Sequence, residues 1–434
     1  MSGAPSERCD VLVVGGGPAG SSAAAILAER GHRVVLLEKA RHPRFHIGES
    51  LLPANLPLFE RLGVAAEIRA IGLPKRGAVF HAEGSARAQR FAFADGWNKA
   101  LPFAYEVRRS EFDAILIARA AALGAEVIEE CRAREVEFTG EGAVRLSAEQ
   151  AGAERRFEAR YLIDASGRDT FLASRFGTKL RNGKHASCAM YAHFGGAWRD
   201  ADCERRGDIA VFWFEDGWCW SIPLPDGTSS VGAVVWPDYM KRRDRDVREY
   251  FLETIARCPQ LAERLAGAKL LTEVQATGSY SYQCERVRGA RYLLIGDAYS
   301  FIDPVFSSGV LFAMAGGIAA GEALDAALRE PRRARAALRR FERTVRRGPR
   351  CFSWFIYRMT RPAMQALFMG PKNPLRMREA LLSLLAGDIY EGTPIWPSLR
   401  AFQGLYLLTA LLMPRRSWAA WTRRTRRLDA AMHG

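Results

Sequence analysis

The sequence lacks the cysteine patterns of zinc proteins and of disulfide-stapled domains. Its eight cysteines are scattered along 434 residues, none forms a C-x-x-C pair, and no histidine cluster accompanies them. Neither a metal site nor a disulfide framework is therefore expected. Unpaired cysteines suit a reducing compartment, so the predicted location is cytoplasmic.

Segments typical of membrane proteins are also scarce. The longest late apolar run, Leu405–Met413, is far too short to cross a bilayer. It favours a core helix, although the basic stretch after it leaves contact with a membrane surface as a less favoured alternative. No signal peptide is expected, because the residues from Cys9 onward already resemble a buried strand.

Acidic residues are in deficit. The chain has 63 Lys and Arg against 48 Asp and Glu, a net charge of +15, and nine arginines fall between Pro331 and Arg350. Such runs usually form a solvated helical face, but they also attract acidic partners such as an anionic membrane or an acyl carrier protein. No nucleic-acid partner is predicted.

The N-terminus carries a dinucleotide-binding pattern. A short β-branched run, Cys9–Val14, leads into Gly15-x-Gly17-x-x-Gly20 and an alanine-rich helix, and Glu38 ends the next strand. The glycines allow a tight turn, close approach of a diphosphate to the helix N-terminus, and close packing of helix on strand. A carboxylate at the position of Glu38 is suited to accept hydrogen bonds from ribose hydroxyls.

The remaining segments predict an α/β protein, α+β overall, with interleaved domains. Residues 185–280 alternate apolar and polar side chains in short runs, which indicates a mainly antiparallel sheet. Residues 291–325 return to strand–loop–helix, and the chain after Pro331 is predicted to be helical. The expected divisions are a Rossmann-like FAD-binding domain at 1–80, 106–184 and 286–330, a substrate domain at 81–105 and 185–285, and a helical C-terminal region at 331–434.

Two further motifs follow predicted strands. Asp164-Ala165-Ser166-Gly167 and Gly296-Asp297-Ala298 resemble segments of the class A flavoprotein monooxygenase superfamily. In that superfamily the Gly-Asp aspartate contacts the ribityl part of FAD, and an arginine at a helix start, here Arg109, contacts the cofactor too. Arg108 departs from the family pattern, which usually has aspartate there.

A sharper resemblance, to the flavin-dependent halogenases, spans residues 9 to about 325. It rests on the W-x-W-x-I-P motif at Trp218–Pro223 and on the segments His46–Pro53 and Phe301–Val310. The resemblance implies FAD as cofactor, with O2 and a halide (chloride or bromide) as cosubstrates. Reduced flavin and O2 give a flavin hydroperoxide, and halide attack on it gives hypohalous acid. The cofactor-binding residues it implies are Gly15, Gly17, Ala19, Gly20, Glu38, Lys39, Arg44, Glu49, Ser50, Arg109, Asp164, Gly167, Gly296 and Asp297.

The same resemblance assigns roles near the reacting atoms. The backbone amides of Ser308 and Gly309 are expected to bind halide, and Lys75 is expected to activate hypohalous acid, by a hydrogen bond or as a haloamine. Two indoles two residues apart share one face of a strand. The expected wall between flavin and substrate comprises Trp218, Trp220, Pro304 and Phe306.

Phe306 stands where halogenases of free tryptophan carry a glutamate that assists attack on a weakly activated ring. Its presence predicts an electron-rich phenol or pyrrole as substrate, free or tethered to an acyl or peptidyl carrier protein. FADH2 is expected from a separate flavin reductase, because the sequence shows no second nucleotide fingerprint. The alternatives are a flavin hydroxylase or lipid reductase of the same fold, and a non-catalytic flavoprotein acting as a binding partner in a biosynthetic assembly.

Overall fold

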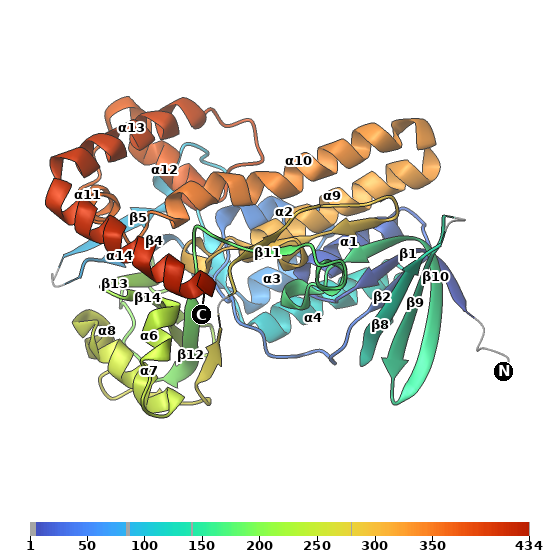
Figure 1. Cartoon of the computed structure of the whole chain (residues 1–434), viewed down its shortest axis with the longest axis horizontal. Helices are drawn as coiled ribbons and strands as arrows, with labels where there is room; N and C mark the ends of the chain where they lie inside the picture. The colour runs from blue at the N-terminus through green and yellow to red at the C-terminus, as the bar shows by residue number, and fades with distance from the viewer. Residues whose placement is uncertain (1–5, 84–86, 140–141, 279, 434) are drawn as a thin grey trace.

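In the computed structural model, which describes residues 6–83, 87–139, 142–278 and 280–433, two sheets lie side by side and a helical region covers the second (Figure 1). The first sheet has seven strands in the order β7-β2-β1-β10-β9-β8, and β19 also pairs with β10. Strands β7, β2, β1, β10 and β19 are mutually parallel, whereas β8 and β9 extend β10 as an antiparallel meander. The strands are β1 (Glu7–Val14), β2 (Val34–Leu37), β7 (Glu126–Ile128), β8 (Cys131–Phe138), β9 (Val144–Gln150), β10 (Ala153–Asp164) and β19 (Tyr292–Leu294).

Helices α1 (Pro18–Glu29) and α4 (Arg109–Ala122) pack on this sheet, and α9 (Gly309–Arg329) packs on α1. Helices α1 and α9 approach closely because α9 has glycines at the contact. A Cβ added at Gly317 would lie 2.3 Å from the carbonyl oxygen of Ala19, and one at Gly321 would lie 2.7 Å from Cβ of Ile26. Within the described chain, α9 alone is long and apolar enough to cross a membrane, but 67% of that stretch is buried inside the protein. It is a core helix.

The second sheet has eight strands in the order β16-β12-β15-β14-β13-β4-β5, and β17 pairs with β12. Every pairing is antiparallel except that of β13 with β4, which confirms the predicted mainly antiparallel sheet. Because β4 begins at residue 77, it joins this sheet before the division expected at residue 80. The strands are β4 (Gly77–His81), β5 (Ala88–Ala92), β12 (Cys188–Gly195), β13 (Ile209–Phe214), β14 (Gly217–Pro223), β15 (Thr228–Val235), β16 (Lys269–Leu270) and β17 (Gln275–Thr277).

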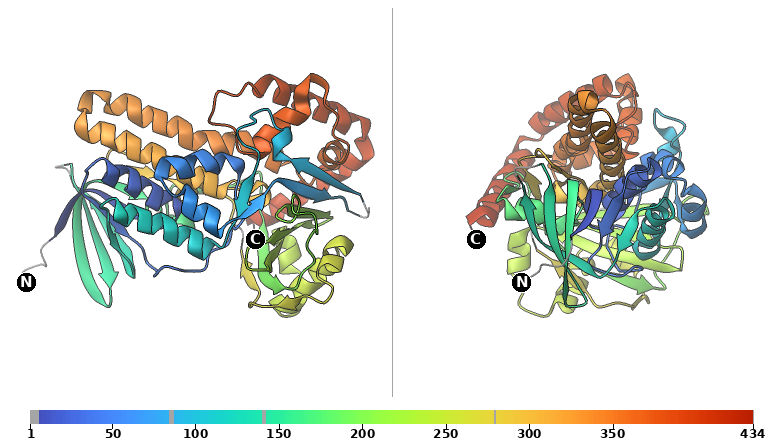
Figure 2. Two further views of the ribbon diagram at one scale, coloured as in Figure 1. Left: turned by 180° about the vertical axis from the view of Figure 1, so that it is seen from behind. Right: turned by 90° about the vertical axis from the view of Figure 1, so that its right-hand side faces the viewer.

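Different helices cover the two faces of this sheet. Alternate side chains of β12–β15 pack on one face against α6 (Pro237–Lys241), α7 (Val247–Ala256) and α8 (Pro259–Arg264). The opposite face contacts the C-terminal helices, so the domain has three layers, as the two views of Figure 2 show. The C-terminal helices are α10 (Pro331–Ile356), α11 (Pro362–Met369), α12 (Met377–Leu385), α13 (Trp396–Leu412) and α14 (Pro414–His433).

Two small sheets connect the large ones. The first pairs β3 (Leu73–Lys75) with β6 (Ala104–Glu106), and the second joins β11 (Lys179–Arg181), β18 (Tyr282–Cys284) and β20 (Ser300–Phe301). Short helices α2 (Leu56–Leu62), α3 (Ala65–Ile71) and α5 (Phe171–Arg175) complete the fold. The strand–turn–helix units predicted from sequence are confirmed with end shifts of a few residues. The carboxyl ends of β1 and β10 and the N-termini of α1 and α9 face the second sheet, and the site lies there.

Candidate active site

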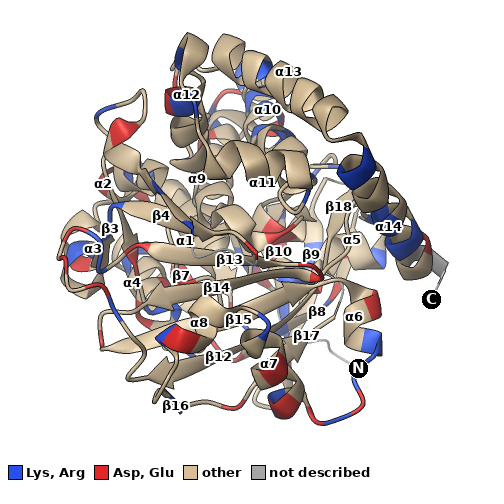
Figure 3. Cartoon of the chain, turned by 90° about the vertical axis from the view of Figure 1, so that its left-hand side faces the viewer, with Lys and Arg blue, Asp and Glu red and all other residues tan. Residues whose placement is uncertain are grey.

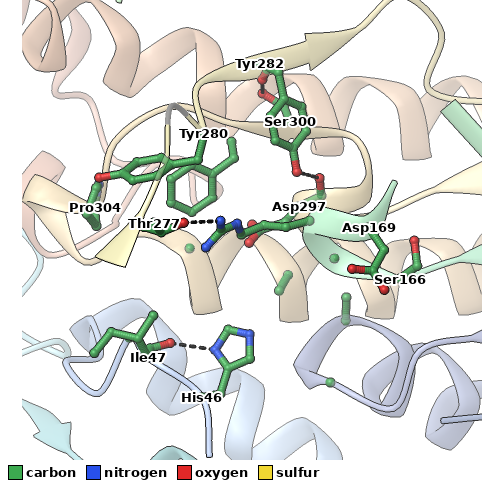
Figure 4. A pocket seen from close by; sticks show the side chains of 18 of the residues that line it. His46, Ile47, Ser166, Asp169, Thr277, Tyr280, Tyr282, Asp297, Ser300 and Pro304 are labelled. Carbon is green, nitrogen blue, oxygen red and sulfur yellow. Dashed lines mark hydrogen bonds between the residues drawn. The ribbon is translucent and has the colours of Figure 1, made fainter. Parts of the chain in front are cut away.

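A cavity of about 1770 Å³ lies where the two sheets meet. Its lining comes from the turn after β1, the segment 44–50, the loop after β10, strand β14 and the segment 297–313 at the start of α9. Figure 4 shows residues from these segments around one open space, with His46 and Ile47 facing Asp297, Tyr280 and Pro304 across it. A long ligand could therefore contact both domains.

The glycine turn leaves room for a diphosphate at one end of this cavity. Gly15 has φ +105°, a backbone conformation that favours glycine, and a Cβ there would lie 2.3 Å from the carbonyl oxygen of Ala165. At Gly17, which caps α1, an added Cβ would meet only Nη2 of Arg44, at 3.7 Å. No side chain caps the first amides of α1. They are available to an anionic group, as the FAD diphosphate requires.

Glu38 lies beside this turn, as predicted. Its carboxylate accepts hydrogen bonds from the backbone N–H of Gly16 at 2.7 Å and of Ala40 at 2.9 Å. Nε of Arg44 lies 3.7 Å from Oε1 of Glu38, and Lys39 forms an ion pair with Asp169. The carboxylate is thus fixed at the cavity edge, where its remaining lone pairs suit ribose hydroxyls. Further basic side chains line the same region: Arg132, Arg134, Arg168, Arg175, Lys179 and Arg181.

Arg109 is the first residue of α4, and it positions the segment 47–48. Its guanidinium donates to both carboxylate oxygens of Asp113, at 2.9 and 3.1 Å, and to the carbonyl oxygen of Ile47 at 3.0 Å. Across the cavity, burial raises the pKa of Asp297 to about 6, and the charge of Arg109 acts in the opposite direction. Both residues line the cavity, where the resemblance placed them.

Trp218 and Trp220 form an aromatic side of the cavity. They project from one face of β14, their ring centroids are 5.9 Å apart, and both line the cavity. Trp220 donates from Nε1 to Oγ of Ser230 at 3.2 Å, and a Cβ at Gly232 would lie 2.2 Å from its ring. The indole is therefore held by a hydrogen bond and by a neighbour without a side chain.

The segment before α9 brings backbone amides to the cavity. Asp303 accepts a hydrogen bond from the N–H of Val305 at 3.1 Å and pairs with His185 at 2.8 Å. Ser307 has φ +54°, and α9 begins at Gly309. Ser308 and Gly309 line the cavity. Because the first amides of a helix have no intrahelical acceptor, this end of α9 is suited to an anion.

Comparison with known proteins agrees with this geometry. Residues 8–347 match the family model described as an FAD binding domain. A flavin-dependent halogenase of Armillaria mellea, armH3, is 34% identical over 346 residues, covering 74% of this chain and 68% of the relative. A chlorinase of 1H-pyrrole-2-carbonyl peptidyl-carrier protein from Pseudomonas fluorescens is 28% identical over 88% of this chain and 90% of its own length. The solved myxobacterial chondrochloren halogenase CndH is 33% identical, with a TM-score of 0.78, over 93% of this chain and 97% of that one.

The chain belongs to the flavin-dependent halogenase family. It is an FAD-dependent oxidoreductase, which confirms the resemblance carried by the tryptophan motif and the segments around residues 46 and 301. Membership of this family also excludes both alternative functions: that of a hydroxylase or lipid reductase, and that of a flavoprotein without activity.

In this halogenase Lys75 is buried, 1% exposed, at the end of β3. Its ammonium donates to Oγ of Ser50 at 2.8 Å and to the carbonyl oxygen of Leu51 at 3.0 Å. Ser50 in turn donates to Oε1 of the buried Glu106 at 3.1 Å. Burial lowers the pKa of Lys75 and raises the pKa of Glu106 to about 8. Ser50 lines the cavity and Lys75 does not, so the lysine is linked to the cavity lining through its hydrogen bond to Ser50.

Four other predicted site residues do not line the cavity. Gly20 is a packing position, because a Cβ there would lie 1.9 Å from the carbonyl oxygen of Gly15. Gly296, with φ +58°, packs on Ala19. Asp164 holds the loop after β10 by accepting bonds from the N–H groups of Ser166 and Leu172.

Phe306 is the fourth of these residues. It is buried against Phe352, with ring centroids 5.9 Å apart, and forms part of the core behind the aromatic side. The turn at Pro304–Phe306 directs its ring into that core, whereas Pro304 faces the cavity. The other predicted residues line the cavity: Ala19, Glu49, Gly167 and those described above.

Some cavity residues were missed by the sequence analysis. Arg168 follows Gly167, bonds to Thr277 and lies 5.6 Å from the ring centroid of Tyr280. Its place directly after the Asp-Ala-Ser-Gly motif could have indicated it. Tyr191, whose ring centroid is 6.3 Å from that of Trp220, carries no local motif, because the pairing of β15 with both β12 and β14 brings it there.

Proposed function

We propose that this halogenase acts on an electron-rich aromatic ring, a phenol or a pyrrole. The observation that carries this proposal is the residue at position 306, a phenylalanine that packs on Phe352 and offers no carboxylate to assist attack on a less reactive ring. The similarity to the pyrrolyl chlorinase over most of both chains supports the same substrate class.

FAD fits the cavity between the glycine turn and the aromatic side. Reduced FAD supplies hypohalous acid from O2 and halide when it is bound. The residues proposed to hold it are those of the turn, Glu38, Lys39 and Arg44 at the diphosphate and ribose end, with Arg109 and Asp297 farther along. The amides of Ser308 and Gly309 would hold the halide, because they offer donors and the positive end of α9 without a carboxylate of their own.

Trp218 and Trp220 would keep the aromatic substrate away from the flavin, so that only the small hypohalous acid reaches it. Lys75 would activate that acid. A lysine whose pKa is lowered by burial can either donate a hydrogen bond or react as a neutral amine. In this structure the ammonium donates to Ser50, a residue of the cavity lining, so the acid would have to replace that hydrogen bond to reach the lysine.

The proposed partners are a flavin reductase and, for a tethered substrate, an acidic carrier protein. Helix α10 offers the carrier a basic surface, since seven of its arginines are exposed: Arg332, Arg333, Arg335, Arg339, Arg340, Arg343 and Arg350. Opposite charges on the enzyme and the carrier speed their encounter and fix their relative orientation. We place the enzyme in the cytoplasm because all eight of its cysteines are free.

The proposal is tested by product analysis. The holoenzyme, a flavin reductase, NADH and either chloride or bromide are incubated with free and carrier-bound phenols and pyrroles, and with tryptophan, and products are identified by mass spectrometry. Halogenated phenol or pyrrole is expected. Lys75→Ala should still bind FAD and consume O2 but give no halogenated product. Efficient halogenation of tryptophan alone would contradict the substrate class.

A further inference from the structure

The corner between α13 and α14 exposes an unusual amount of apolar surface. Helix α13 buries Phe402 and Tyr406, as expected of a core helix, but its outer face carries four leucines that are 60–84% exposed: Leu407, Leu408, Leu411 and Leu412. The first turns of α14 add Trp418 and Trp421, 66% and 48% exposed, with ring centroids 5.2 Å apart. We call these six side chains the apolar corner.

The surroundings of the apolar corner are basic. Residues 392–428 contain no aspartate or glutamate, and they contain seven arginines. Arg415 and Arg416 lie between the leucines and the indoles and are exposed. Figure 3 shows this end of the molecule, where the mostly uncharged α13 leads into α14, whose ribbon is blue at its arginines. A surface that is both apolar and cationic complements a surface that is both apolar and anionic.

The corner is held rigidly on the protein. The hydroxyl of Ser417 donates to the carbonyl oxygen of Ala410 at 2.9 Å and ties the two helices where the chain turns. Farther along α14, Arg427 pairs with Asp216 and Asp238, and Arg424 donates to the backbone of Tyr357. The inner face of α14 is therefore committed to the protein, whereas the outer face is free to contact another surface.

We propose that the apolar corner docks the halogenase on an anionic lipid bilayer. Leucines enter the acyl-chain boundary, paired tryptophans occupy the interface, and Arg415 and Arg416 contact lipid phosphates. A second copy of the chain is a poorer occupant, because a twofold contact would bring the same arginines together without acidic residues to pair with them. The inference is independent of the substrate proposed above.

Helix α14 connects this docking surface to the site. Its first turns carry the two tryptophans, and Ala431, near its other end, lines the cavity. In Figure 1 the helix runs from the outer left edge of the molecule toward the junction of the two sheets. Docking by the corner would fix the position of this end of the cavity relative to the lipid surface.

Sedimentation of the FAD-loaded full-length protein with vesicles tests the proposal. The vesicles contain phosphatidylcholine alone or with roughly one third phosphatidylglycerol, at about 0.1 and 0.5 M of an inert salt. We expect binding to the anionic vesicles, weaker binding at high salt, and quenching of tryptophan emission by lipids brominated on the acyl chain. Leu411→Ser combined with Leu412→Ser should weaken binding by at least about tenfold, since two largely exposed leucines lose their transfer into lipid.

The matched control is Leu271→Ser combined with Leu375→Ser, which changes two exposed leucines (53% and 74%) elsewhere on the molecule. It should bind as the wild type does, and both double variants should keep their FAD content and melting temperature. Arg415→Glu with Arg416→Glu should remove the preference for anionic lipid. Absence of binding to anionic vesicles, equal binding by the leucine variant and its control, or loss of a dimer instead of lipid binding in the leucine variant would each overturn the proposal.

Discussion

Replacing Lys75 by methionine should make the stability of the protein go on falling as the pH rises through 8, where the stability of the wild type levels off. Lys75 and Glu106 are both buried and are linked through Ser50 by bonds of 2.8 and 3.1 Å, so Nζ and Oε1 lie within about 6 Å of each other. Methionine keeps the length of the side chain and removes the positive charge. It leaves Glu106 as a buried acid without its cationic neighbour.

The magnitude follows from the pKa of Glu106. Burial raises it from 4.5 to about 8, and the charge of Lys75 acts to lower it, so without Lys75 it rises above 8. Above pH 4.5, Glu106 of Lys75→Met then releases its proton in the unfolded chain but keeps it in the folded chain. Stability is therefore lost at about 1.4 kcal/mol for each pH unit, or about 2.7 kcal/mol between pH 6 and pH 8. In the wild type Glu106 ionises near pH 8, so this loss of stability ends there, whereas in Lys75→Met it continues to higher pH.

Glu106→Gln should show the opposite sign. The remaining Lys75 has a pKa below its ordinary 10.5, so stability should rise with pH across the interval between the two values. The double variant should have neither slope, and it should be more stable at pH 8 than Lys75→Met alone, because both partners are then uncharged. Urea unfolding of the four proteins at three pH values measures this. Parallel pH curves for wild type and Lys75→Met above pH 8 would refute a charge-coupled pair.

Three further predictions concern the cofactor, the substrate and the partner. Gly17→Val should fold, because its Cβ meets only Arg44, but it should purify without FAD, because the rest of the side chain occupies the diphosphate space. A yellow protein with normal FAD content would contradict this prediction. Phe306→Glu should slow the native reaction, because it buries a charge against Phe352. It should not create a tryptophan halogenase, because the rest of the pocket is unchanged. Mass spectrometry of the products from the native substrate and from tryptophan decides. For a carrier-bound substrate, kcat/KM should fall steeply as a non-halide salt is added, and Arg339→Glu with Arg340→Glu should have the same effect. If added salt changes the turnover of neither the free nor the carrier-bound substrate, the carrier is excluded.

The sequence predicted those parts of the molecule that depend on local pattern. The glycine turn, Glu38 and the tryptophans of β14 lie where spacing and resemblance placed them, because each depends on one strand and the residues next to it. Residues whose position depends on distant segments could not be located this way. Glu106, which is linked to Lys75 through Ser50, is 31 positions away from it in the sequence, and nothing local connects them. The direction of the Phe306 ring likewise depends on α10.

The order of segments in the first sheet has a consequence for how the enzyme is made. Strand β1 lies between β2 and β10, and β19 completes the parallel set beside β10 only after more than 270 residues have followed β1. The cavity also needs the first turn of α9. At about 5–20 residues per second, a ribosome takes on the order of a quarter of a minute to a minute to supply these pieces. Until then the nascent chain has a glycine turn but no closed cofactor cavity, so FAD joins the chain late in synthesis or after release, and fragments that end before α9 should remain colourless.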